Sequence, residues 1–239
     1  LVTVTAAPAA VRTQSVAGKV LALDGAALAD VTVTATGGAT ATSASDGSLS
    51  LMLGVGIPQT LRFTRAGFAT QVQTFTVPTS SGSDARFDVV MLPQQPQQTL
   101  ADASAGGTLS GKDGAQIALP ANALVSASGA AVTGAVQISM TPVDVTEPRA
   151  GGFPGRFEGI NADASISPIV SLGPTEFVLT QGGAPVQIAP GASATITMPI
   201  YADRDLDGRL FAVGDRIPLW SLDEQGGGWI NEGEGVLVA

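Results

Sequence analysis

The strongest constraint on the fold is the alternation of apolar and polar residues along much of the chain. Residues 31–36 read Val-Thr-Val-Thr-Ala-Thr, which in an extended strand places the apolar side chains on one face and the threonines on the other. No helical pattern longer than about two turns accompanies it. Gly37-Gly38 then predicts a two-residue hairpin turn into a second strand. The chain is therefore expected to be all-β.

Segments of strand length recur through the first 92 residues, separated by turn residues such as Asp46-Gly47. About seven short strands spaced roughly 8–12 residues apart are typical of a β-sandwich. Helix content is expected to be below about 10%. The predicted strands cover residues 15–23, 31–36, 39–44, 49–53, 60–65, 71–77 and 86–92.

A boundary is predicted after the first sandwich. Residues 93–98 read Pro-Gln-Gln-Pro-Gln-Gln, and a segment with two prolines and no other apolar residue tends to be an extended, semi-rigid linker. The charge also changes here: residues 1–98 carry five bases and five acids, whereas the remainder carries six bases and fifteen acids. The predicted organisation is an N-terminal strand and linker (1–15), a β-sandwich (16–92), a linker (93–105) and a second β-domain (106–239).

The second half is also expected to consist of strands. Its predicted strands cover residues 114–119, 131–141, 159–165, 177–180, 194–200, 217–222, 228–231 and 235–238, and one helical turn is expected at 120–124.

The composition excludes several classes of site. The 239 residues contain no histidine and no cysteine, which removes Ser-His and Cys-His nucleophile pairs, zinc fingers and disulfides. A net charge of −9 disfavours binding to nucleic acid. No apolar run reaches the roughly 18–20 residues of a membrane span. We therefore expect a non-catalytic protein without a nucleic-acid partner or a membrane span.

Five short segments of the first half follow one another in a recognisable order: Gly18-Lys-Val20, Asp24-Gly25, residues 29–33, residues 42–47 and residues 61–68. In this order, residues 16–92 resemble the carboxypeptidase regulatory-like (transthyretin-like) domain. The resemblance implies a seven-stranded, Ig-like or transthyretin-like sandwich that has no catalytic role and is appended to enzymes, receptors and surface proteins. Asp30 stands where the family usually has glycine.

The second half carries Gly106-Gly-Thr-Leu109, Thr133-Gly-Ala-Val136 and Ile217-Pro-Leu-Trp220. With residues 114–124, these segments are similar to the ZU5-like β-domains of extracellular proteins, including those next to YD-repeat (Rhs or teneurin-type) shells. The resemblance implies a second β-sandwich and a secreted, cell-surface or periplasmic location. Some ZU5 domains cleave themselves at a His-Phe-Ser step, and the absence of histidine here removes that activity.

The best chemical signal is the acidic segment 203–209. Its carboxylates at positions 1, 3 and 5, glycine at 6 and backbone carbonyl at 7 follow a calcium-binding loop. Position 12 is Gly214 rather than a bidentate glutamate, and the nearest acid comes one residue late. The segment predicts one structural Ca²⁺, with a solvated acidic turn as the alternative. The candidate metal ligands are Asp203, Asp205, Asp207, Arg209 and Asp215.

Late acidic residues and two tryptophans offer a glycosidase interpretation, because paired carboxylates cleave glycosidic bonds and indoles stack on sugars. Trp220 and Trp229 are flanked by apolar residues, which favours a role in the core or in a hairpin. The acids concerned are Asp223, Glu224, Glu232 and Glu234.

The sequence therefore predicts a non-catalytic structural or adhesion module of a secreted or cell-surface bacterial-type protein, stabilised by calcium. Two alternatives stay open. One is a filament subunit assembled by strand exchange, in which the alternating residues 1–5 pair with a sheet edge of a neighbouring molecule. For the same residues, an edge of their own chain or of a preceding domain is the other possible partner. The second alternative is an accessory domain of a larger surface enzyme or YD-repeat toxin-like protein. The expected partners are neighbouring domains, identical subunits, or a polysaccharide or protein ligand.

Overall fold

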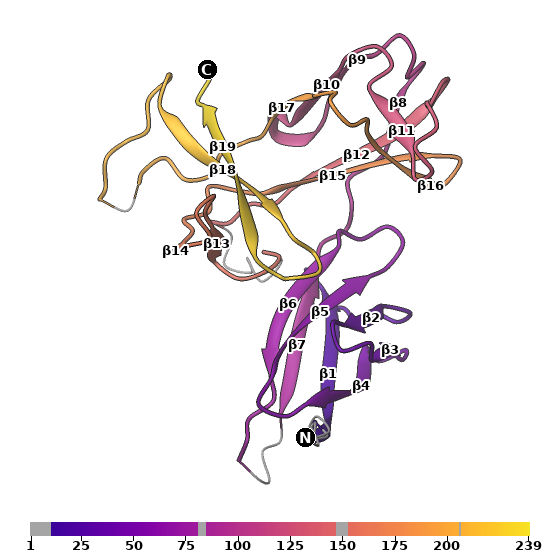
Figure 1. Ribbon diagram of the computed structural model, residues 1–239, viewed down its shortest axis with the longest axis vertical. Coiled ribbons are helices and arrows are strands. Elements are labelled where there is room, and N and C mark those ends of the chain that lie inside the picture. The colour runs from indigo at the N-terminus through magenta and orange to yellow at the C-terminus, as the bar shows by residue number, and fades with distance from the viewer. Residues whose placement is uncertain (1–10, 81–84, 147–152, 206) are drawn as a thin grey trace, which may run out of the picture.

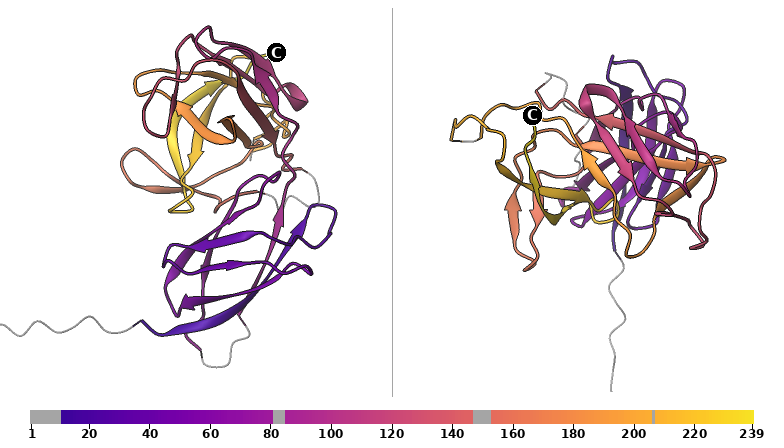
Figure 2. Two further views of the ribbon diagram at one scale, coloured as in Figure 1. Left: turned by 90° about the vertical axis from the view of Figure 1, so that its right-hand side faces the viewer. Right: turned by 90° about the horizontal axis from the view of Figure 1, so that it is seen from above.

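The computed structural model describes residues 11–80, 85–146, 153–205 and 207–239. Within these ranges the regular structure is almost entirely β, which confirms the predicted fold class. The single helical segment among them is the 3-10 turn η1 (Lys112–Gly114). The first half of the chain lies at one end of the long axis and the second half at the other (Figures 1 and 2).

The first half forms two sheets, with strand orders β4-β1-β7 and β3-β2-β5-β6. The central strand β1 pairs antiparallel with β4 and parallel with β7. Each of the seven predicted strands is present, although their ends differ by a few residues. The strands are β1 (Thr13–Ala22), β2 (Thr32–Ala35), β3 (Thr40–Thr42), β4 (Ser48–Gly54), β5 (Pro58–Thr64), β6 (Gln71–Thr76) and β7 (Arg86–Met91).

The core of the first half follows from the alternation in the sequence. In β1, the buried residue Val16 points inward between exposed neighbours, and Val20 points inward after the exposed Lys19. Phe63 and Phe87 meet edge to face, with ring centroids 5.8 Å apart. Gly18 lies against the Phe87 ring, where a Cβ atom would collide with it. The period-two pattern therefore determines which side chains fill this core.

The second half contains three sheets, with orders β17-β10-β9, β11-β16-β15-β12-β8 and β14-β13-β19-β18. Its strands are β8 (Gln98–Leu100), β9 (Gly107–Ser110), β10 (Gln116–Leu119), β11 (Leu124–Ser126), β12 (Val136–Pro142), β13 (Glu158–Ile160), β14 (Ile166–Pro168), β15 (Thr175–Gln181), β16 (Ala184–Ile188), β17 (Thr195–Thr197), β18 (Arg216–Leu222) and β19 (Trp229–Val236).

A second cluster of buried residues lies among the first two of these sheets and shares no member with the cluster of the first half. Leu100, Ile117, Leu124, Ile138 and Met140 belong to it. The sheet β14-β13-β19-β18 differs, because within its strands only Gly159 and Trp229 are buried. This sheet is therefore more open to solvent than the five-stranded sheet, whose strand β12 is buried at all but one position.

Four local predictions for the second half are corrected. The strand predicted at 131–141 begins only at Val136, as β12, and Ala131 makes an isolated bridge to Val125. Residues 120–124 do not form a helical turn, because Asn122 has a left-handed φ of 56° and β11 begins two residues later, at Leu124. The strand predicted at 159–165 ends at Ile160, where a turn leads into β14. The two strands predicted at 228–231 and 235–238 are the single strand β19, which bends at a bulge beside Leu219.

Candidate functional site

The predicted calcium loop is folded as a tight hairpin. Arg204 and Leu210 form an isolated β-bridge, and the Phe211 N–H donates to the Asp203 carbonyl at 2.9 Å. The carbonyl of Arg209, one of the predicted ligands, accepts the Asp205 N–H at 3.0 Å. The backbone of the loop is therefore held by its own hydrogen bonds.

The Arg209 side chain joins two of the candidate carboxylates. Its Nε lies 3.2 Å from Oδ2 of Asp205, and its Nη1 lies 2.9 Å from Oδ2 of Asp215. The pKa of Asp205 is lowered, chiefly by the hydrogen bond that its carboxylate accepts from the backbone N–H of Arg209. The pKa of Asp215 is lowered mainly by the N–H of Ala212 and then by the Arg209 guanidinium. A cation of the protein itself thus neutralises this part of the loop.

Asp203 and Asp207 do not join that arrangement. The Asp203 side chain is 81% exposed, and its nearest cation is Arg204 at 3.9 Å. Asp207 contributes its backbone N–H to Asp205 Oδ1 at 3.1 Å. Among the residues that the structure describes, no group of three or more acidic side chains is placed to hold a metal ion. Calcium binding therefore stays a prediction, and it requires Arg209 to release its carboxylates.

The late acidic residues each have a separate partner. Glu232 accepts a hydrogen bond from the Ser221 hydroxyl at 2.6 Å, and Glu234 pairs with Arg216 at 3.1 Å. The remaining two, Asp223 and Glu224, lie in the turn between β18 and β19, where Asp223 accepts the N–H of Gln225. Each of these carboxylates is therefore engaged in its own local interaction.

The two tryptophans lie on the paired strands β18 and β19. Trp229 is 7% exposed and packs on Phe153, with ring centroids 5.3 Å apart. Trp220 covers Gly159 of β13, where any side chain would meet its indole ring. These contacts confirm the prediction that both residues pack within the sheet region.

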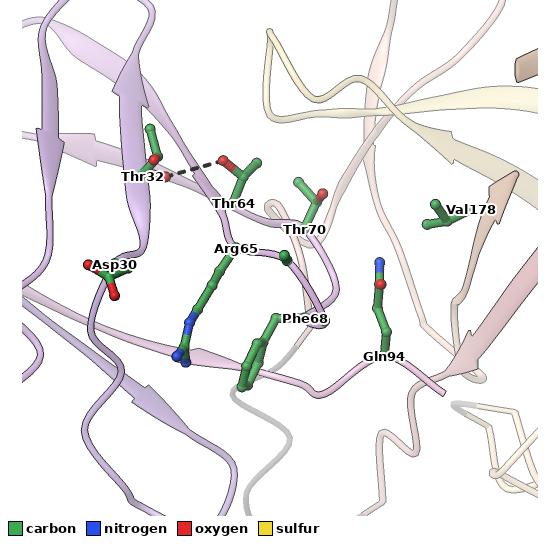
Figure 3. A pocket seen from close by; sticks show the side chains of 10 residues that line it. Asp30, Thr32, Thr64, Arg65, Phe68, Thr70, Gln94 and Val178 are labelled. Carbon is green, nitrogen blue, oxygen red and sulfur yellow. Dashed lines mark hydrogen bonds between the residues drawn. The ribbon is translucent and has the colours of Figure 1, made fainter. Parts of the chain in front are cut away.

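A shallow pocket of about 400 Å³ lies where the first half meets β15 (Figure 3). Arg65 extends beside Phe68, with its guanidinium carbon 4.9 Å from the ring centroid. Thr64 and Gln94 lie on the wall nearby, and Val178 closes the side formed by β15. The lining mixes one cation, the carboxylate of Asp30, hydroxyl groups and apolar atoms.

Glu176 of β15 lies beside this pocket and connects the two halves. Its carboxylate accepts the backbone N–H of Thr70 at 2.8 Å and the side-chain amide of Gln94 at 3.3 Å. Burial raises the pKa of Glu176, and the neighbouring Glu224 adds to the rise, whereas both hydrogen bonds and the charge of Arg62 oppose it. Glu176 is not among the predicted site residues, since nothing local to it in the sequence signals burial.

The turn between β18 and β19 forms a second connection. The Arg62 Nε lies 2.5 Å from Oε2 of Glu224, and the Thr60 hydroxyl donates to the Gly226 carbonyl at 3.0 Å. A third connection runs from the N–H of Gly155 to the Val72 carbonyl at 2.6 Å. Three separate segments of the second half therefore contact strands β5 and β6 or the residues that follow them.

The segment predicted as a linker is bonded to both halves. The N–H of Gln94 donates to the Gly67 carbonyl at 2.9 Å. The next residue, Gln95, donates to Thr141 Oγ1 at 3.1 Å and accepts the Ser139 hydroxyl at 2.8 Å. Residues 98–100 then enter the second half as β8. The extended Pro/Gln segment therefore joins the halves through fixed hydrogen bonds.

No protein-family model matches the chain, and no curated protein matches it. Across the described ranges, no helix has the length and apolar character needed to cross a membrane. The resemblances to the carboxypeptidase regulatory-like and ZU5-like domains therefore stay hypotheses.

Proposed function

We propose that the chain is a non-catalytic structural or adhesion module of a secreted or cell-surface bacterial-type protein. In this proposal, a carboxypeptidase regulatory-like sandwich and a ZU5-like β-domain hold one fixed relative orientation. Its partners are neighbouring domains of a larger surface protein, identical subunits, or a polysaccharide or protein ligand.

The observation that supports this proposal is the junction between the halves. A chain whose domains moved freely would need only the covalent linker between them. Here Glu176, Glu224 and the backbone of Gly155 all reach across to the first half. The linker residue Gln95 is also bonded on the far side, to Thr141 and Ser139. Such a junction is expected in a protein that holds its two halves in one fixed relative orientation.

Calcium is proposed as a stabilising ion of the loop at residues 203–215. Carboxylates of Asp205 and Asp215 suit Ca²⁺, which prefers oxygen ligands. The ion would replace the Arg209 guanidinium between them, and Asp203 and Asp207 would turn inward to complete the ligand set. Binding would then anchor the loop without taking part in a reaction.

The absence of cysteine makes a direct test of the fixed orientation practical. A Met52→Cys, Val213→Cys variant places one spin label on an exposed site in each half, since these side chains are 53% and 72% exposed. Double electron–electron resonance should give one narrow distance distribution. The combined Arg62→Ala and Glu176→Ala substitutions should broaden it, whereas Arg216→Ala, which breaks an ion pair within one sheet, should leave it narrow. A broad distribution in the parent chain would refute the proposal.

The filament alternative depends on residues 1–5, which lie outside the described residues. One feature favours it: β7 ends the sheet order β4-β1-β7, and such a strand is an edge to which another strand can add. Deleting residues 1–10 and measuring mass by light scattering tests it, because a filament subunit would lose assembly and keep its melting temperature. The accessory-domain alternative is decided by the sequence of the full-length gene product.

A further inference from the structure

Three isoleucines form a row across neighbouring strands of the sheet β14-β13-β19-β18. Ile160 of β13 pairs in register with Ile166 of β14 and with Ile230 of β19. Residues that pair in register project to the same face of a sheet, so the three side chains lie side by side. They are 39%, 69% and 42% exposed in that order. We refer to Ile160, Ile166 and Ile230 as the isoleucine row.

The opposite face of the same strands is the one that packs. Gly159 and Trp229 precede Ile160 and Ile230, pair with each other, and are buried. Phe153 covers Trp229 on that side. Successive residues of a strand point to opposite faces, and this alternation directs the isoleucine row outward. The row is thus an exposed apolar feature on a sheet that has little core of its own.

Carboxylates flank the row on its own face. Glu158 lies two residues before Ile160 and projects to the same side as the isoleucines. Glu232 lies at the bulge of β19, and its carboxylate reaches the same side, because it accepts the hydroxyl of Ser221, the residue that pairs with Ile230. Glu158 has a half-exposed partner, Arg156, at 3.3 Å. Glu232 accepts only the Ser221 hydroxyl, and the described residues place no cation within ion-pair distance of it. Residues 156–170 and 216–236 together contain six acids and two arginines.

These charges indicate which class of partner fits the isoleucine row. Apolar surface rimmed by polar groups is typical of interaction sites. A second copy of the chain would bring acidic rims together, and an anionic membrane surface would be repelled. A cationic protein segment with an apolar centre complements both features. Because β13 and β19 are parallel, the two carboxylates stand four residues apart along the strand direction, about 13 Å in a regular strand and somewhat less here because Glu232 lies at the bulge of β19.

We propose that the isoleucine row and its flanking carboxylates dock an extended protein segment with an apolar residue between two Lys or Arg residues. Four residues of an extended chain span a similar distance, roughly 13 Å, so basic residues at positions i and i+4 meet Glu158 and Glu232 while the apolar residue at i+2 covers the row. The inference rests on the proposed adhesion role and specifies the chemistry of the partner.

The test uses a capped synthetic peptide, Ser-Gly-Lys-Thr-Ile-Thr-Lys-Gly-Ser, titrated into the ¹⁵N-labelled full chain. Chemical-shift changes should be confined to β13, β14 and β19, and the affinity should fall as salt is raised. Peptides with glutamate in place of lysine, or serine in place of isoleucine, should bind at least about tenfold more weakly, since each removes one of the two complementary features.

Variants of the chain locate the binding site. Ile230→Ser and Glu232→Gln should each weaken binding of the lysine peptide at least about fivefold, a change of about 1 kcal/mol. Met52→Ser, at a similarly exposed apolar residue of the first half, is the matched control and should bind normally. Equal binding of the glutamate peptide, shifts outside this sheet, or no saturable shift would overturn the inference. So would a dimer of the parent chain that Ile230→Ser dissociates, because the occupant would then be a second copy.

The two proposals fail separately. A narrow spin-label distance with no peptide binding would reject the docking site and keep the fixed module. A broad distance with specific peptide binding would reject the fixed orientation and keep the docking site.

Discussion

Arg62 of β5 and Glu224 of the β18–β19 turn are 162 residues apart in sequence, and their side chains meet at 2.5 Å. The two side chains are 42% and 43% exposed, so solvent screens the pair. The ion pair therefore contributes more to the relative orientation of the halves than to the free energy of unfolding. The buried part of the junction is formed by Glu176.

Removing this ion pair should cost little stability. In a double-mutant cycle of Arg62→Ala and Glu224→Gln, we expect a coupling of about 0–1 kcal/mol that decreases with salt. Urea denaturation at low and high salt measures it, and the exposed Arg216–Glu234 pair provides a comparison within a single sheet. A coupling of several kcal/mol would show that the pair is more deeply desolvated than its exposure indicates.

The junction should become less stable as the pH rises through the titration of Glu176. Because burial raises its pKa, the folded chain holds this proton more tightly than the unfolded chain does. The contribution of Glu176 to the free energy of unfolding is then fully present below pH 4.5, the ordinary pKa of a glutamate. It is lost as the pH rises from 4.5 through the raised pKa of the folded state. Glu176→Gln should remove this loss.

Melting temperatures measured from pH 4.5 upward test this prediction. The range lies above the region in which the aspartates with lowered pKa values, such as Asp102, titrate and contribute the opposite slope. Glu158→Gln, on an exposed strand of another sheet, is the control. Identical pH profiles for the parent and Glu176→Gln would mean that Glu176 is hydrated in solution.

Gly159→Ala should destabilise the open sheet. The new Cβ would enter the space of the Trp220 indole, and overpacking of this kind costs about 1–3 kcal/mol. Gly235→Ala is a matched control on the neighbouring strand, because its Cβ would meet the flexible Leu219 side chain at 3.2 Å. Chemical denaturation followed by tryptophan fluorescence should show a clearly larger loss for Gly159→Ala.

Calcium and Arg209 should compete for the acidic loop. If the ion binds, Arg209→Gln removes the competing cation, and calorimetry should show tighter calcium binding than in the parent. Asp205→Ala should abolish binding. A hundredfold excess of calcium over its dissociation constant would stabilise the parent by about 2.7 kcal/mol. A melting temperature that EDTA leaves unchanged would exclude structural calcium here.

Local pattern was sufficient to predict the seven strands of the first half, because their alternation coincides with the burial in the core. It failed where pairing depends on distant residues. Gln98 reads as part of a polar linker, yet it begins β8, pairs with Ile138 and bonds to the carbonyl of Ser110. The strand β16 was missed because proline and alanine weaken its pattern, although it pairs with both β11 and β15.

In the candidate sites too, local sequence predicts some features, whereas others depend on residues that are distant in the sequence. The spacing of Asp203, Asp205 and Asp207 indicates an acidic loop, but it does not reveal that the chain returns to place Asp215 beside Arg209. Glu176 has no distinguishing neighbours in sequence. Its burial arises only when Thr70 and Gln94 approach from another part of the chain.

The parallel pairing of β1 and β7 has a mechanical consequence. The chain enters the first half at Thr13 of β1 and leaves it after Met91 of β7, and the two strands run side by side from Ala17 to Ala22. Tension applied through the two ends pulls these strands in opposite directions along their length. All of their shared hydrogen bonds are then loaded in shear together, rather than opened one at a time. A module built this way resists stretching along the axis on which its neighbours would pull.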